Sequence, residues 1–163
     1  MILLAIDSGV EKTGFAVFSR VNLHTGDPRL IASGLIKTDK KLPIQVRLSK
    51  IFDELTNIIK KYKPTIVVLE QLFFFRNQKT AIQVSQSQGI VLLLCAQFNI
   101  KVKYLTPLQI KQIITGYGQA DKKSIQKMIK LSLGVTISSS RDDEADAIAC
   151  GLAYCYLNMN LVE

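Results

Sequence analysis

The chain has 163 residues, of which 48% are hydrophobic and 21% are charged, and its formal net charge at pH 7 is +8. This composition fits one globular domain with a sizeable core and excludes a disordered protein. The longest apolar run, residues 89–96, is too short to cross a bilayer, and no basic segment precedes an apolar one at the start, so we expect a cytoplasmic protein without membrane association or signal peptide.

The first part of the chain alternates short apolar runs with polar turns and then changes to a helical period. Apolar residues between Pro43 and Tyr62 recur at steps of three and four, which indicates an amphipathic helix. The expected elements are a strand at residues 2–6, a turn at 8–14, a strand at 15–21, a turn at 24–28, a strand at 29–38 and a helix at 43–62.

The second part contains two more strands separated by helices. Its expected elements are a central strand at residues 65–70, a loop at 71–78, a helix at about 80–98, a strand at 101–105, a helix opened by Thr106 and ended by Gly116, a helix from Asp121 to Leu133, and a last helix introduced by residues 138–140. This order predicts an α/β fold in one domain, residues 1–163. We expect a mixed five-stranded sheet, with three antiparallel strands and then parallel strands, flanked by helices on both faces.

Four acidic residues in three places are the candidate functional residues. Asp7 and Glu70 each end an apolar strand, and if those strands are parallel neighbours, both side chains lie at one edge of the sheet. Asp143 and Asp146 are three residues apart on a helix and share a face. Like charges crowded together are unfavourable without a cation, and carboxylate oxygens suit Mg²⁺ or Mn²⁺. The four acids therefore predict a divalent metal site.

Each acid also has a simpler interpretation. Asp142 and Asp143 are ordinary residues for the first turn of a helix, where they complement its dipole, and an acid at the end of a strand is often a solvated turn residue. The metal site is favoured because acids in suitable positions occur in all three places, at the ends of two strands and on one helix. A basic chain around such a site also favours a polyanionic substrate.

Four ordered segments carry a resemblance to a known family. They are IDSGVEKTGFAVF, VVLEQLFFFRNQKTA, TPLQIKQIITGYGQADKKSIQKMI and DEADAIA. Together they resemble the RuvC family of Holliday junction resolving endonucleases, within the ribonuclease H-like superfamily. The resemblance implies that Asp7, Glu70, Asp143 and Asp146 are the catalytic and metal-binding tetrad. Ser8 departs from the family, which usually has proline there, and Asp142 adds an acid beside the tetrad.

The resemblance implies an endonuclease that resolves four-way DNA junctions by paired symmetric nicks during recombination and repair. Two Mg²⁺ ions per site, or Mn²⁺, would position the water and stabilise the leaving oxygen. The family position of Phe73 stacks on bases opened at the junction centre. Lys111 and Lys122 would touch the DNA backbone, and Arg76 is a further candidate for a phosphate contact. Solvated lysines, and phenylalanines that seal a core or a subunit contact, are the simpler interpretations.

The helix at about 80–98 carries more apolar residues than one buried stripe needs. It is either a core helix or, as the resemblance implies, part of a homodimer interface. The family also works with the RuvA and RuvB branch-migration complex.

The sequence is also compatible with three other functions. One is another ribonuclease H-like nuclease that acts on branched DNA or RNA hybrids, and a second is a non-catalytic junction-binding protein. A third is a phosphotransferase of the sugar-kinase and actin type, because IDSGVEKTG resembles its phosphate turn. That class needs a second phosphate loop and a longer chain.

Overall fold

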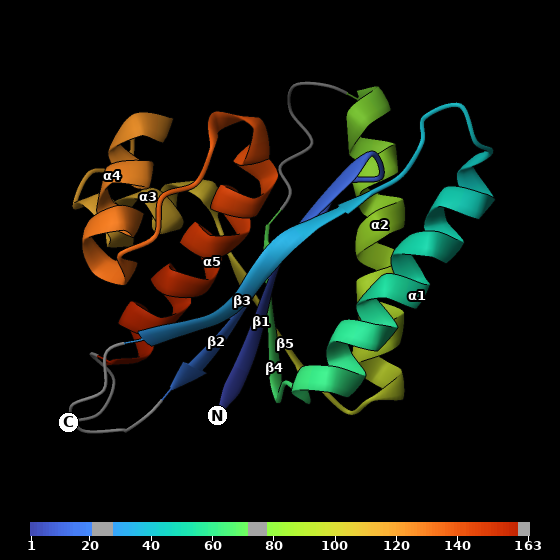
Figure 1. Ribbon diagram of the computed structural model, residues 1–163, viewed down its shortest axis with the longest axis horizontal. Coiled ribbons are helices and arrows are strands. Elements are labelled where there is room, and N and C mark those ends of the chain that lie inside the picture. The colour runs from blue at the N-terminus through green and yellow to red at the C-terminus, as the bar shows by residue number, and fades with distance from the viewer. Residues whose placement is uncertain (21–27, 72–77, 160–163) are drawn as a thin grey trace.

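Five strands form one mixed sheet in the order β3-β2-β1-β4-β5. The computed structural model describes residues 1–20, 28–71 and 78–159 (Figure 1). The strands are β1 (Ile2–Asp7), β2 (Lys12–Arg20), β3 (Pro28–Lys37), β4 (Ile66–Glu70) and β5 (Lys101–Leu105). The helices are α1 (Ile44–Tyr62), α2 (Gln78–Gln97), α3 (Pro107–Thr115), α4 (Lys122–Leu133) and α5 (Asp142–Met159), the last preceded by a 3₁₀ turn at Ser139–Arg141.

The pairing of the strands confirms the predicted sheet. β1 pairs with β2 and β2 with β3 in antiparallel fashion, whereas β1 with β4 and β4 with β5 are parallel. In this register Asp7 lies opposite Gly14, and Ile6 lies beside Leu69. The first and fourth strands are therefore the parallel neighbours that the candidate site requires.

Helices cover both faces of the sheet, as predicted (Figure 1). Strand side chains alternate between the faces. Leu3 and Ala5 of β1 belong to the core beneath α3, α4 and α5, whereas Leu4 and Ile6 belong to the core beneath α1 and α2. The α5 side is unusually tight, because a Cβ on Gly151 would come within 2.4 Å of the Phe18 ring.

Two element boundaries differ from the predictions by two or more residues. β2 begins at Lys12, so the predicted turn over residues 8–14 is wrong in its last part. The Thr13 hydroxyl donates to the Gly9 carbonyl at 2.6 Å, and Gly14 already pairs with Asp7, so a shorter turn closes this hairpin. α2 begins at Gln78 rather than near residue 80. Boundaries of this kind depend on tertiary contacts more than on local propensity.

The predicted helix ends in the second half are confirmed. Thr106 forms a capping box with Gln109, and the Asp121 side chain accepts a hydrogen bond from the Ser124 backbone N–H. Gly116 and Gly134 end their helices with positive φ angles, which glycine adopts without strain. Within the described part of the chain, no helix is both long and apolar enough to cross a membrane.

Candidate functional site

Asp7 and Glu70 lie at the carboxyl ends of the adjacent parallel strands β1 and β4. Strand alternation determines which way they face. Asp7 shares a strand face with Leu3 and Ala5, and Glu70 shares one with Val68, and these three apolar residues all belong to the core under α5. Both carboxylates therefore lie on the α5 side of the same sheet edge.

α5 brings the other two acids to this edge. Asp143 and Asp146 lie in the first turns of α5, and this part of the helix packs directly on β2. A Cβ on Gly14 would come within 1.9 Å of the Asp143 carbonyl oxygen, so only glycine permits this approach. Because Gly14 pairs with Asp7 in the sheet, the close contact places the start of α5 beside the end of β1.

The electrostatics indicate that the four acids share one site. Burial, and after it the charges of Asp146, Glu70 and Asp143, raise the pKa of Asp7 to about 8 against the lowering effect of Lys122. Burial and the charge of Asp146 raise the pKa of Glu70, which Lys111 opposes. Burial also raises the pKa of Asp146, and the nearby Lys122 lowers it. Negative charge is therefore costly here, as expected where carboxylates converge.

Lys122, the first residue of α4, partly compensates for this charge. Its ammonium nitrogen lies 3.3 Å from Asp142 Oδ2 and 3.7 Å from Asp146 Oδ2, and Asp146 is the main cause of the raised pKa of Lys122. Asp142 thus forms an exposed ion pair, whereas Asp143 acts on Asp7. Asp142 also raises the pKa of Asp146, so the choice of Asp143 over its neighbour stays a prediction.

A pocket of about 180 Å³ opens beside these residues. It is lined by Glu70, Pro107, Ile110, Lys111, Lys122, Ile125, Asp146 and Ala149. Two acids and two lysines that were singled out from the sequence therefore line one pocket. Their charges suit a substrate that carries phosphate alongside a cation.

The four carboxylates are chemically suitable ligands for a hard divalent cation, but their side chains do not lie close enough together to coordinate one. Carboxylate oxygens are the preferred ligands of Mg²⁺. The raised pKa values of Asp7, Glu70 and Asp146 come first from burial and then from the charges of neighbouring acids, which a bound cation would offset. Among the described residues, no three His, Cys, Asp or Glu side chains are grouped closely enough to hold a metal ion. Binding would therefore require rotamer changes of these acids, with Lys122 yielding part of its contact to Asp146.

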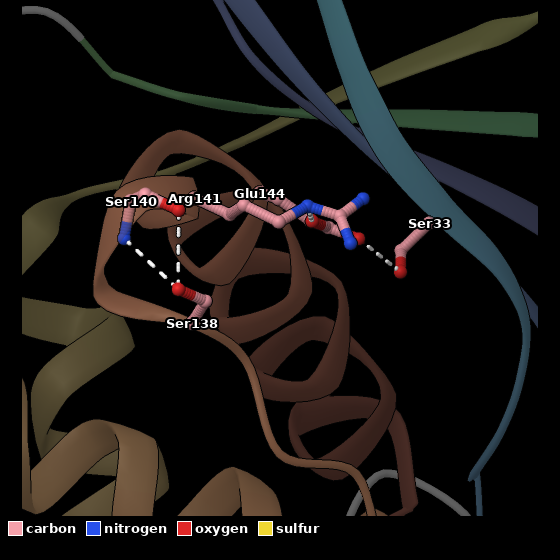
Figure 2. Close-up of polar contacts among 5 residues, drawn as sticks. All are labelled: Ser33, Ser138, Ser140, Arg141 and Glu144. Carbon is pink, nitrogen blue, oxygen red and sulfur yellow. Dashed lines mark hydrogen bonds and ion pairs between the residues drawn. The ribbon is translucent and has the colours of Figure 1, made fainter.

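Two predicted DNA-binding residues, Phe73 and Arg76, lie outside the described residues, so their roles stay predictions. In contrast, the sequence did not single out Gly14 of β2, which lies against the start of α5, or Glu144, which lies in the first turn of that helix. Glu144 is buried between Ser33 and Arg141 (Figure 2). Its position within a run of acids concealed it, because adjacent residues on a helix face different directions and the run itself does not show which acid is buried.

Comparisons with known proteins agree over nearly the whole chain. The family model described as "Crossover junction endodeoxyribonuclease RuvC" matches residues 3–155. The chain is 41% identical over 157 residues to RuvC of Caldicellulosiruptor saccharolyticus, covering 96% of this chain and 92% of the relative. It is 42% identical over 157 residues to RuvC of Thermomicrobium roseum, with the same two coverages of 96% and 92%.

A solved structure of T. thermophilus RuvC in complex with a Holliday junction substrate is similar throughout. The TM-score is 0.87 at 26% sequence identity, covering 98% of this chain and 96% of that one. The sheet, the helices on both faces and the acidic edge thus occur in a chain that matches one family model over residues 3–155. The chain belongs to the RuvC family of crossover junction endodeoxyribonucleases, which have a ribonuclease H-like fold.

Proposed function

We propose that this protein resolves Holliday junctions by paired, metal-dependent nicks during recombination and repair. The observation that carries the proposal is the convergence of Asp7, Glu70, Asp143 and Asp146 at one sheet edge in a chain of the RuvC family. The similarity to a RuvC structure that contains a Holliday junction supports the choice of substrate.

The tetrad is proposed to hold two Mg²⁺ ions, with Mn²⁺ as a substitute. Such a pair would activate a water, neutralise the scissile phosphate and stabilise the leaving oxygen. The protein's own part is to hold four carboxylates on two rigid elements, the sheet edge and α5. Lys122 stays protonated beside Asp146 and limits the repulsion before the ions bind.

The DNA backbone is proposed to lie over the pocket. Lys111 and Lys122 line it together with Glu70 and Asp146, so both ammonium groups lie near the position of a phosphate that approaches the tetrad. Contacts of this kind release counterions, and binding should therefore weaken steeply with salt. Phe73 and Arg76 follow Glu70 in the chain, and we propose stacking on opened bases for the first and a phosphate contact for the second.

The active unit is proposed to be a homodimer. A four-way junction has approximate two-fold symmetry, and paired nicks require two opposed active sites. α2 supports this proposal because Val91, Leu94 and Cys95 are buried against the sheet while Ile82 and Leu93 are 62% and 53% exposed.

From family membership we also propose that the protein cooperates with the RuvA and RuvB branch-migration complex and that it is cytoplasmic. The three cysteines of the chain are buried thiols, which fits a reducing compartment.

The test is incubation with a synthetic four-way junction and with a linear duplex of the same sequence, with and without Mg²⁺. We expect paired symmetric nicks only in the junction and only with metal. Asp7→Asn should abolish the nicks and leave junction binding intact or stronger, because it removes a ligand and a negative charge facing the DNA. Cutting of duplex or RNA hybrid would assign another nuclease activity, and binding without cutting would assign a scaffold.

A further inference from the structure

Glu144 is a buried carboxylate in the first turn of α5, between the two tetrad members of that helix. Only 3% of the residue is exposed. The Ser33 hydroxyl donates to Oε1 at 2.6 Å, and Nε of Arg141 lies 2.5 Å from Oε2 (Figure 2). Ser33 belongs to β3, so this chain of contacts joins the beginning of α5 to an edge strand of the sheet.

Stability alone does not explain a carboxylate at this position. A buried charge must be paired and hydrogen-bonded to be tolerated, and an apolar residue of similar volume often stabilises as well or better. The neighbouring buried positions of α5 are filled by small apolar residues such as Ala145 and Ala147. Arg141 contributes an ion pair in which Oε2 accepts no hydrogen bond, so the directional contact is the hydrogen bond from Ser33 to Oε1. What this directional contact adds over apolar packing is a defined rotation and height of the helix turn relative to β3.

The first turn of α5 has contacts on two sides. On β2, Gly14 lies against the backbone of Asp143; on β3, Ser33 holds Glu144. Successive residues of an α-helix differ by roughly 100° around the axis, so Glu144 can face β3 while Asp143 and Asp146 face the end of β1. A rotation of this turn would move both tetrad acids relative to Asp7 together.

The path into the helix is fixed as well. Ser138 caps the 3₁₀ turn by accepting from the Ser140 backbone N–H, and the two serine hydroxyls lie 3.1 Å apart (Figure 2). Arg141, which follows, is the residue whose guanidinium reaches Glu144. Cap, arginine and glutamate thus form a continuous series of polar contacts from the loop to β3.

We propose that Glu144 is a positioning residue: its contacts with Ser33 and Arg141 set the rotation of the first turn of α5, so that Asp143 and Asp146 meet Asp7 and Glu70 as metal ligands. This inference rests on the proposed function, because it assigns Glu144 to the same metal-dependent site. Glu144 itself contacts neither metal nor DNA. Its removal should weaken metal binding and turnover and leave junction binding unchanged.

The sharpest test uses two substitutions of Ser33 that have the same shape. Ser33→Thr retains the hydroxyl that donates to Glu144, and Ser33→Val lacks it. Mn²⁺ binding to the protein without DNA, measured by calorimetric titration, should be within twofold of wild type for Ser33→Thr and at least fivefold weaker for Ser33→Val. Glu144→Gln should weaken it by a similar factor, because the amide keeps the acceptor for Ser33 and loses the charge facing Arg141.

Cleavage and stability complete the test. We expect Ser33→Val and Glu144→Gln to need several times more Mg²⁺ for half-maximal cleavage and to lower kcat about tenfold, with KM and junction affinity unchanged. Ser87→Ala is the control, since Ser87 is also buried but lies on α2, distant from α5, and its loss should leave metal dependence unchanged.

Three results would overturn the proposal. Equal effects of Ser33→Thr and Ser33→Val would show that shape and not the hydroxyl matters. A lower melting temperature with unchanged Mn²⁺ binding would make Glu144 a purely structural residue. A raised KM and a weaker salt dependence in Arg141→Gln, with normal Mn²⁺ binding, would make Arg141 a phosphate ligand instead. If wild type binds Mn²⁺ but never cuts junctions, the proposed function fails, and the Mn²⁺ titrations still decide the role of Glu144.

Discussion

Asp7 lies where its negative charge is costly, between a largely apolar core and three other carboxylates. Its pKa of about 8 compares with an ordinary value of 3.8, and the main cause is burial. Beneath the acids lies Cys150, whose thiol pKa is raised by burial and by the charges of Glu70 and Asp7. Cys150 is thus a buried, neutral neighbour of these acids, and the acids themselves supply the charge that a cation would meet.

This raised pKa predicts how metal-free stability depends on pH. Because the folded state holds the Asp7 proton more tightly than the unfolded chain does, stability is highest below the unfolded pKa near 4 and falls as pH rises toward about 8. We expect the melting temperature in EDTA to drop more between pH 5 and 8.5 for wild type than for Asp7→Asn, by several degrees. A kcal/mol corresponds to roughly 2–4 °C in a domain of this size.

The same linkage predicts that Mg²⁺ binding releases protons. Ligands must be deprotonated to bind, so affinity should rise from pH 6 to 8.5, and calorimetry in buffers of different ionisation enthalpy should detect the released protons. Glu70 and Asp146, whose pKa values are also raised, contribute in the same direction. A melting temperature with the same pH dependence in wild type and Asp7→Asn would contradict this account.

At the scale of elements, the contact between β2 and α5 is the feature that assembles the site. Gly14 touches backbone atoms of Asp143, and backbone cannot rotate out of the way as a side chain does. The same contact connects sheet register to chemistry, since Gly14 is paired with Asp7. Small changes at this point should therefore affect catalysis more than their volume suggests.

Gly14→Ala is expected to displace the first turn of α5. The added methyl would overlap the Asp143 carbonyl, so we expect a stability loss of about 1–3 kcal/mol, as for overpacked cores, and at least a tenfold loss of cleavage. Denaturant unfolding and junction cleavage measure the two effects. Gly34→Ala on β3 is the matched control: its methyl would meet the Phe15 ring, a side chain that can move, so cleavage should be retained. Equal losses in both variants would refute the argument.

Most of the helices and strands, but not all of their contacts, could be predicted from the sequence. Apolar periodicity and caps such as Thr106 and Asp121 defined most elements, because those signals are local. The start of β2 at Lys12 was missed, since it depends on pairing with β1 across the hairpin. The two strand-ending acids were found because parallel neighbours must meet at one edge. Glu144 was missed because its significance lies in contacts with β3, more than a hundred positions away in the chain.

At the scale of the whole molecule, α2 presents apolar side chains to solvent on the side away from the sheet. Ile82, Leu92 and Leu93 are exposed; Ile82 and Leu93 lie on the same face of the helix, and Leu92 lies beside that face. Exposed apolar surface of this kind marks contact sites in soluble proteins. Together with the two-fold symmetry of a junction, it supports the proposed homodimer.

Leu93→Asp tests this interface. A carboxylate there would face its symmetry mate or an apolar surface. We therefore expect the dissociation constant of the dimer to rise at least a hundredfold, measured by sedimentation at several protein concentrations. Paired nicks should become single nicks, while Mn²⁺ binding per chain is retained because the tetrad is intact. Glu54→Gln, an exposed change on α1, is the control and should leave association unchanged. A dimer that persists in Leu93→Asp would place the interface elsewhere.

The position of α5 along the chain has a consequence for synthesis. Ribosomes deliver β1 and β4, with Asp7 and Glu70, well before α5 emerges with Asp143 and Asp146. α5 also fills the core on one face of the sheet, where Ile148 and Leu152 are buried. A nascent or prematurely terminated chain therefore carries half of the acids without a docked helix to complete them. With the proposed tetrad as the active site, cleavage of DNA requires that folding of that face is finished.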